Sequence, residues 1–274
     1  MYNFQSDYLE GCAPEILEEL IKTNNKQQAG YGNDDYCLLA KRLIKNAIKN
    51  EDVDIHFVPG GTPCNILAHS IALRPYEAVI SADTAHINVH ESGAIEAKGH
   101  KILTTPNRDG KIDPFEIVKI IEKHPDEHMV KPKMVFITNP TELGTVYTLD
   151  EVRLLRQICD KHGLYLYMDG ARLSNALASL GNTLRLAAHA NKTADALKYI
   201  FSAFNIKPYT NSPTNQQFYI LDNEVIKKLQ QKYIFEIWDQ YDEKSSVCRF
   251  VTSWCTKEEA TLEFASDLKE ALSK

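Results

Sequence analysis

Hydrophobic and polar positions follow two different periods along this chain. Leucine and isoleucine recur at helical spacing in several stretches, which predicts helices with one apolar face, and short continuous apolar runs between them predict buried strands. The predicted helices span residues 13–25, 34–50, 65–74, 113–124 and 148–163, and the predicted strands span residues 53–58, 77–83, 133–140 and 164–169. Strands that alternate with helices indicate an α/β fold with a parallel sheet and crossover helices.

The pattern changes after residue 209. Two alternating strands, predicted for residues 216–222 and 248–254, lie on either side of a helix predicted for residues 223–233. This arrangement is typical of a smaller α+β domain. We therefore expect three parts, namely an N-terminal segment (residues 1–30), a large domain (residues 31–200) and a small C-terminal domain (residues 201–274).

The bulk composition is that of an ordinary globular chain. Its 274 residues carry a formal net charge of −6, which argues against nucleic acid as a partner because phosphate binding needs a basic surface. The cysteines are scattered without a CxxC pair, which indicates a reducing compartment. The N-terminus lacks the features of a signal peptide, and no stretch reaches the length of a membrane span. We expect a cytoplasmic protein with no membrane partner.

Polar residues gather where the predicted strands end. Such clusters occur at residues 60–62, 83–86, 139–141 and 169–172. In open α/β sheets, ligands bind outside the carboxyl ends of the strands. The sequence therefore predicts one site that draws on all of these clusters.

The first cluster contains Gly60, Gly61 and Thr62 between a predicted strand and a helix. Glycines there let the backbone approach an anion, and free N–H groups at the helix start, with the Thr62 hydroxyl, can hold a phosphate. A plain strand-to-helix turn explains the same residues equally well, because short strings of this kind are common.

The second cluster contains His86, with His90 and Glu91 close behind it. A histidine just after a strand can stack on an aromatic cofactor or shuttle protons, and His86 and His90 have the i, i+4 spacing of a metal pair. The segment is not HExxH, and nearby acids lack the spacing of metal ligands, so no metal is predicted. A structural surface histidine is the alternative.

The fourth cluster ends an apolar run with Asp169 and, three positions later, Arg172. An aspartate beside a bound heteroaromatic ring can pair with a protonated ring nitrogen, which keeps the ring an electron sink as in pyridoxal phosphate chemistry. Arg172 can then face a ring hydroxyl or a carboxylate. A helix-capping aspartate and a solvated arginine are the alternative reading.

Together these segments resemble one known family. The strings that carry the resemblance are SDY, YGND, GGTPCN, AHINVHESGAIE, GHKI, DGKI, TNPTELGTVYT, DGARL and RFVTSW, in this order. The sequence resembles the threonine aldolase and β-eliminating lyase family of pyridoxal-phosphate enzymes. The resemblance implies the aspartate aminotransferase fold (fold type I), a three-layer sandwich with a mostly parallel sheet and a small α+β C-terminal domain.

The resemblance also assigns roles to single residues. It implies a phosphate loop at Gly60, Gly61 and Thr62, a ring-stacking histidine at His86, a pyridine-nitrogen partner at Asp169, a ring-side arginine at Arg172, a carboxylate-binding position at Arg249, and pocket-lining positions at Ser6 and Tyr31. The implied cofactor is pyridoxal 5'-phosphate and the implied substrate is an amino acid. A homodimer or homotetramer is implied as well.

One expected residue is absent. The family carries a lysine, in a string resembling GGTK downstream of DGAR, that bonds covalently to the cofactor aldehyde, and no such string occurs here. A central segment, including one strand, is therefore predicted to be deleted, which would leave a sheet edge open. Lys192, Lys198 and Lys207 lie nearby, and Lys198 is predicted on the solvated face of a helix. A shortened gene product or splice form, an incomplete sequence and a non-catalytic paralogue all stay open.

Two functions follow from this pattern. The first is a pyridoxal-phosphate-dependent lyase that cleaves a carbon–carbon bond or performs β-elimination on an amino acid, in a chain that lacks the covalent lysine. The second is a non-catalytic, shortened relative that binds or dimerises. A sugar or nucleotide enzyme that uses Gly60–Thr62 for phosphate leaves the DGAR and RFVTSW strings unexplained.

Overall fold

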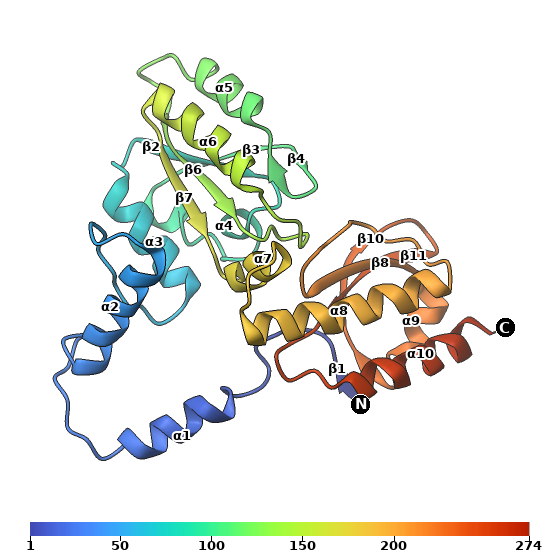
Figure 1. Ribbon diagram of the computed structural model, residues 1–274. Helices are drawn as coiled ribbons and strands as arrows, with labels where there is room; N and C mark the ends of the chain where they lie inside the picture. Colours follow the sequence, from blue (N-terminus) through green and yellow to red (C-terminus); the bar gives the residue numbers. More distant parts are fainter. Residues whose placement is uncertain (274) are drawn as a thin grey trace. The chain divides into compact units, whose positions relative to one another are not determined.

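The computed structural model describes residues 1–273, and the chain forms two compact units (Figure 1). One unit joins residues 1–9 to the chain from Asn65 onward, and the other spans residues 10–64. The larger unit contains both the parallel sheet and the C-terminal region. The expected divisions after residues 30 and 200 stay predictions.

The larger unit is built on a parallel sheet of four strands in the order β3-β2-β6-β7. These strands are β2 (Glu77–Ala82), β3 (Ile102–Thr105), β6 (Lys131–Thr138) and β7 (Tyr165–Asp169). Continuous apolar runs form the central strands β2 and β6 because both faces of a parallel sheet are covered. Strands predicted at residues 77–83, 133–140 and 164–169 are therefore confirmed.

Alternate residues of the central strands face two different layers. Ala78 and Ile80 pack with the apolar sides of α5 (Pro114–Glu122) and α6 (Leu149–His162), which lie across one face in Figure 1. Val79 and Met134 pack on the opposite side with residues of α4 (His86–Val89) and of the chain just after α3 (Gly61–Ala72). The predicted α/β sandwich of three layers is thus the fold observed.

Capping residues set the ends of the two covering helices. The Asp113 carboxylate accepts a hydrogen bond from Phe115 N at 2.9 Å at the start of α5. Thr148 and Glu151 form a reciprocal capping box at the start of α6, and Gly163 ends that helix at a φ of 64°.

β7 is an outer strand of the sheet. Among the described strands it pairs only with β6, and Tyr165 at its start is 49% exposed. A strand in this position presents unpaired backbone groups on its outer side. β7 is thus one edge of this sheet, beside Asp169, and β3 is the other. The predicted deletion of a strand stays a prediction.

The strand predicted for residues 53–58 is wrong. These residues form no helix or strand, and α3 begins at Gly61, before the predicted start at residue 65. A β-strand needs a neighbour to complete its backbone hydrogen bonds, and no described strand pairs with residues 53–58. Apolar patterning is therefore not enough to form a strand there.

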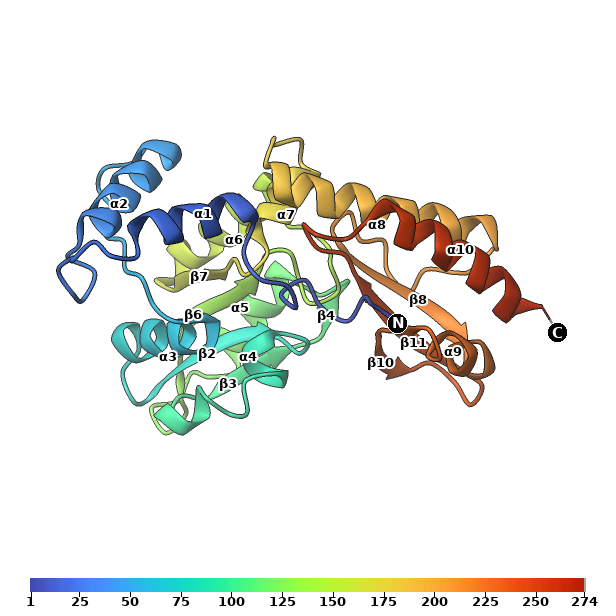
Figure 2. The same ribbon diagram turned by 90° about the horizontal axis from the view of Figure 1, so that it is seen from below.

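The C-terminal region is an antiparallel sheet with helices against it. Its strands β8 (Gln216–Asp222), β10 (Glu236–Gln240) and β11 (Ser245–Val251) lie in the order β10-β11-β8. Figure 2 shows α8 (Arg185–Ala203) and α10 (Glu258–Leu272) along one side of this sheet, and α9 (Asn223–Leu229) follows β8. The predicted α+β character of this region is confirmed.

A cluster of aromatic rings forms the core of this region. Phe201 of α8, Phe250 of β11 and Phe264 of α10 are fully buried together with Phe4 from the N-terminus. β1 (Tyr2–Asn3) adds to the same region by pairing in parallel with β9 (Tyr233–Ile234). Leu197 and Phe201 of α8 both belong to this core, and the helix continues without a break across residue 200.

The unit of residues 10–64 contains two amphipathic helices, as predicted. They are α1 (Pro14–Thr23) and α2 (Asp35–Ile48), and neither has a buried residue. Short elements elsewhere complete the described chain, namely the 3-10 turn η1 (Glu96–Lys98), the hairpin of β4 (Asn107–Arg108) and β5 (Lys111–Ile112), and α7 (Leu173–Ser179). No helix within residues 1–273 has the length and apolar character needed to cross a membrane.

Candidate functional site

Three of the predicted polar clusters meet at the carboxyl end of the parallel sheet. Asp169 is the last residue of β7, His86 begins α4 soon after β2, and Asn139 follows β6 directly. These strands are parallel neighbours, so their carboxyl ends share one edge of the sheet. The fold thus brings His86 and Asp169 to one place, as the sequence predicts.

Asp169 is held by backbone and side-chain donors. Its Oδ1 accepts a hydrogen bond from Ala171 N at 3.0 Å, and its Oδ2 accepts one from Asn65 Nδ2 at 3.2 Å. The backbone N–H of Asn139 donates to the Asp169 carbonyl at 2.9 Å. The carboxylate is therefore fixed in direction at the strand end, where a ligand ring nitrogen can meet it.

His86 is paired with a buried acid. Its Nδ1 lies 2.7 Å from Glu91 Oε1, and the side chains are 39% and 0% exposed respectively. The hydrogen bond with Glu91 raises the pKa of His86. Burial by itself raises the pKa of Glu91, but hydrogen bonds from His86 and Asn65 outweigh it and lower that pKa. The pair favours a protonated ring beside a carboxylate.

Arg172 forms a two-pronged ion pair with Asp7. Its Nε and Nη2 donate to Asp7 Oδ2 and Oδ1 at 2.7 and 2.9 Å, and Asn215 Nδ2 donates to Oδ2 at 2.9 Å. Burial opposes the charge on Asp7, but the hydrogen bond and charge of Arg172 lower its pKa. Asp7 was not among the predicted site residues, although the SDY string contains it.

Ser6 accompanies Asp7 into the site region. Its side chain is buried, and its Oγ has no hydrogen-bond partner among residues 1–273. A buried hydroxyl without a partner is uncommon in native structures. Ser6 therefore remains a good candidate for a polar contact with a ligand.

Arg249 lies in a mostly buried setting on β11. Its side chain is 13% exposed, forms an ion pair with Glu236 and lies over the Trp238 ring at 5.1 Å. Burial lowers the pKa of Arg249. The His90 ring is 5.6 Å from Trp238 and 5.6 Å from His86. This chain of rings connects Arg249 to His86.

The pairing of the two histidines does not resemble a metal site. His86 Nδ1 faces Glu91, and the His90 ring packs between His86 and Trp238. Within residues 1–273, no group of three or more histidine, cysteine, aspartate or glutamate side chains has the arrangement of metal ligands.

Glu142 is a candidate that the sequence reasoning did not single out. It is 9% exposed in the loop after β6, and burial raises its pKa despite the nearby positive charges of His86 and Arg172. The loop is fixed because Ser212 and Thr214 hydroxyls both donate to the Gly144 carbonyl, at 3.0 and 3.1 Å. The available signal in the sequence was a single acid in the TELGTVY string that follows a buried strand.

The remaining predicted residues belong to the unit of residues 10–64. Gly60 has a φ of 118°, and Gly61 and Thr62 begin α3, as a phosphate-binding turn requires. Tyr31 is fully exposed and has a φ of 61°. Roles for Gly60, Gly61, Thr62 and Tyr31 stay predictions.

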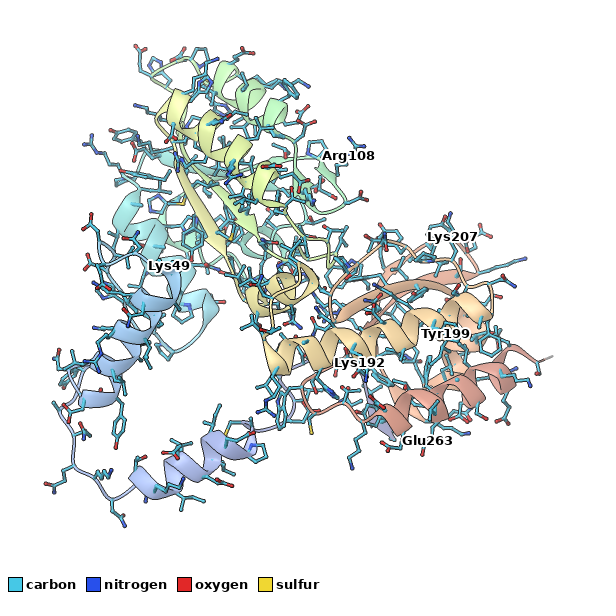
Figure 3. All side chains as sticks on the ribbon, viewed as in Figure 1. Lys49, Arg108, Lys192, Tyr199, Lys207 and Glu263 are labelled. Atoms are coloured by element: carbon cyan, nitrogen blue, oxygen red, sulfur yellow. The ribbon has the colours of Figure 1, made fainter. Side chains whose placement is uncertain are left out.

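The three lysines near the expected anchor position lie on or after α8. Lys192 Nζ pairs with Glu258 at 3.0 Å and Lys198 Nζ with Asp195 at 3.2 Å. In Figure 3, Lys192 lies on α8, and Lys207 lies in the segment that follows that helix in the chain. The Lys198 side chain is 29% exposed, so its predicted place on the solvated face of the helix is only partly met. In the described chain, no hydrogen bond or ion pair joins these lysines to Asp169 or His86.

Comparison with solved structures first defines the class. The fold matches an aspartate aminotransferase mutant of Thermus thermophilus with a TM-score of 0.65 at 12% identity, covering 99% of this chain and 92% of that chain. This likeness shows the fold alone, which is that of the aspartate aminotransferases. The chain also matches the structure of threonine aldolase from Leishmania major with a TM-score of 0.96 at 34% identity, covering 98% of this chain and 99% of that one.

The family follows from the sequence itself. The family model for beta-eliminating lyases matches residues 3–202, so the chain belongs to the beta-eliminating lyase family. It is 38% identical over 182 residues to the low specificity L-threonine aldolase of a Pseudomonas species, covering 66% of this chain and 52% of that relative. The yeast low specificity L-threonine aldolase is 26% identical over 189 residues, covering 67% of this chain and 47% of its own length. The chain thus spans about half the length of the curated relatives it matches.

Proposed function

We propose that this chain descends from pyridoxal-phosphate-dependent lyases and retains their ring-recognition residues. The parent reaction is carbon–carbon cleavage of a β-hydroxy amino acid, such as threonine to glycine and an aldehyde, or β-elimination from an amino acid. The observation that carries the proposal is the meeting of Asp169 and His86 at the carboxyl edge of the sheet. The relative named low specificity L-threonine aldolase and the solved structure named threonine aldolase support the same reading.

The residues present fit the cofactor ring. Asp169 offers a carboxylate whose direction is fixed by Ala171 and Asn65, and His86 keeps part of its ring surface exposed. Thr84 Oγ1 between β2 and α4 is buried with no partner in the described chain, which leaves it free for a further polar contact. This donor and acceptor set suits a protonated pyridine bearing polar substituents.

When bound, pyridoxal phosphate supplies an electron sink for negative charge that develops on the substrate. Asp169 would accept the hydrogen bond of the pyridine N–H and so keep that nitrogen protonated. His86 would cover the ring face and can hold or release a proton there. Arg249 would bind the substrate carboxylate, which would replace Glu236 as its ion-pair partner.

The covalent anchor is the feature that does not fit. Lys192 and Lys198 pair with carboxylates elsewhere on the molecule, and their helix contributes Leu197 to the C-terminal core. We infer that this chain lacks the covalent lysine and that turnover is lost or strongly reduced. The alternative is a non-catalytic relative that binds the cofactor weakly or pairs with another subunit, and the open edge at β7 favours it.

The wider setting is proposed on the same grounds. The substrate would be an amino acid, and the chain would act as a homodimer or homotetramer in the cytoplasm. Size-exclusion chromatography with light scattering measures the assembly directly, and a strictly monomeric protein at micromolar concentration would contradict that part of the proposal.

Absorbance and chemical trapping test the function. The purified chain is mixed with pyridoxal phosphate, its spectrum is recorded before and after borohydride, and labelled lysines are mapped by mass spectrometry. We expect ring binding without a borohydride-sensitive protein band and without a site-specific label. A label confined to Lys192, Lys198 or Lys207 would identify a replacement anchor and restore the catalytic reading.

The matched control is Asp169→Asn. It keeps every lysine, so non-specific surface labelling persists unchanged. A specific label or a ring-binding signal in the original chain should fall at least about tenfold in this variant, because the partner of the ring nitrogen is lost. Equal signals from both proteins would reject Asp169 as the ring partner.

A further inference from the structure

A single buried amide connects the two ring-facing residues. Asn65 Nδ2 donates to Glu91 Oε1 at 2.6 Å and to Asp169 Oδ2 at 3.2 Å. Its Oδ1 accepts a hydrogen bond from the Tyr167 hydroxyl at 2.8 Å. Glu91 Oε1 in turn faces His86 Nδ1 at 2.7 Å. The path His86–Glu91–Asn65–Asp169 therefore consists of hydrogen bonds throughout.

The direction of the amide is fixed by what surrounds it. An ionised carboxylate only accepts hydrogen bonds, so the amide nitrogen must face Glu91 and Asp169. The reversed amide would place an oxygen against two carboxylates and an N–H₂ group against the donating Tyr167 hydroxyl. Asn65 is 1% exposed, so water cannot replace either contact at low cost.

We propose that Asn65 and Glu91 are positioning residues that couple His86 to Asp169. Asn65 aims the Asp169 carboxylate, and Glu91 fixes the His86 ring with its Nδ1 proton turned inward and Nε2 turned toward the site. The catalytic meaning of this relay rests on the proposed function. The relay itself is a property of the chain without ligand.

An unpartnered oxygen argues that this arrangement is more than structural. Glu91 Oε2 is buried and has no hydrogen-bond partner among residues 1–273. A carboxylate retained only for stability would have both oxygens satisfied, since a buried unpaired acceptor destabilises the fold. The charge on Glu91 is instead directed to His86 and Asn65 through its other oxygen.

The charged groups around His86 act in the same direction, except for one. Glu91, Glu142 and Asp169 favour the protonated His86 ring, whereas the neighbouring His90 ring, at 5.6 Å, disfavours a second positive charge. Burial opposes the charge but is weaker than the Glu91 hydrogen bond, and the pKa of His86 is raised. Changes at Glu91 and Asn65 should therefore move the His86 titration in opposite directions.

Histidine-selective nitrogen NMR of the ligand-free protein tests the relay. Glu91→Gln removes the negative partner, so we expect the protonation constant of His86 to fall at least about tenfold. Asn65→Ala removes the amide that shares the Glu91 charge, so the same constant should rise. Asp126→Asn is the matched control because it changes a carboxylate paired with the exposed His128, and it should leave His86 unchanged.

Opposite shifts are the decisive result, because a general loss of packing would move His86 in one direction for both variants. Equal titration of His86 in the original chain and in Glu91→Gln, or shifts of the same sign in both variants, overturns the proposal. If a variant fails to fold, the tautomer of neutral His86 in the original chain still tests the relay.

The relay requires neutral His86 to carry its proton on Nδ1, and a proton on Nε2 would refute the relay. No cofactor enters this experiment, so failed ring binding would reject the proposed function and leave the relay standing.

Discussion

Breaking the ion pair between Asp7 and Arg172 should destabilise the larger unit strongly. The substitution Asp7→Asn keeps the shape of the side chain and removes its charge. Arg172 then stays largely buried without a counter-charge, since the two side chains are only 16% and 20% exposed. Asn215, which also donates to Asp7 at 2.9 Å, then faces a neutral amide instead of a charged carboxylate, and hydrogen bonds to charged groups are the stronger ones.

The magnitude follows from the burial. Removing one partner of a buried ion pair costs roughly 3–5 kcal/mol, and the residual exposure places this pair near the lower end, about 3 kcal/mol. For a unit of this size, each kcal/mol lowers Tm by about 2–4 °C, so we expect a loss of roughly 6–12 °C at pH 7. Differential scanning calorimetry, with tryptophan fluorescence as a second probe, measures it.

The pH dependence gives the prediction a sign. The pKa of Asp7 is lowered in the folded protein, so its stabilisation is present above the unfolded value and is lost as pH falls through the folded value. The difference between the original chain and Asp7→Asn should therefore shrink below about pH 4, where the unfolded aspartate takes up its proton.

Two controls make the result specific. Glu258→Gln breaks the exposed pair with Lys192, whose side chains are 66% and 76% exposed, and should leave Tm unchanged. Combining Asp7→Asn with Arg172→Gln should lose less than the sum of the two single variants, because the unpaired charge is gone. A Tm for Asp7→Asn that matches Glu258→Gln at pH 7 would refute the reasoning.

Three further variants test other parts of the molecule. Phe264→Ala removes a fully buried ring of the C-terminal core and should cost about 3–5 kcal/mol in urea unfolding, and a loss below 1 kcal/mol would contradict the core assignment. Glu142→Gln should raise Tm at pH values above the ordinary carboxyl pKa and should leave Tm unchanged at low pH. The reason is that burial raises the pKa of Glu142, so that its ionisation destabilises the fold; a pH-independent difference in Tm would contradict this. Tyr165→Glu places a negative charge on the open edge of β7, next to Lys133. We expect this charge to reduce self-association measured by light scattering, and unchanged association would argue that the chain does not associate through this edge.

Local patterning was sufficient for most elements. The central strands are recognisable because both of their faces are buried, and α5 and α6 because one apolar stripe repeats at helical spacing. Asp113 and Thr148 cap these two helices through backbone contacts within three positions of themselves, so the local sequence is enough to set the helix starts. The strand predicted for residues 53–58 failed because its formation depends on a partner strand rather than on its own side chains.

Of the candidate site, the sequence by itself determined which residues stand at strand ends, and so it identified His86 and Asp169. Only the tertiary structure decided what those residues contact. Asn65 and Asp169 are 104 positions apart, and Asp7 and Arg172 are 165 positions apart. Contacts of this kind depend on how strands and loops are brought together, which no local period encodes. The burial of Glu142 and the relay from His86 to Asp169 therefore depend on the packing of the sheet edge. The alternation of strands and helices that creates this edge follows from the local sequence pattern.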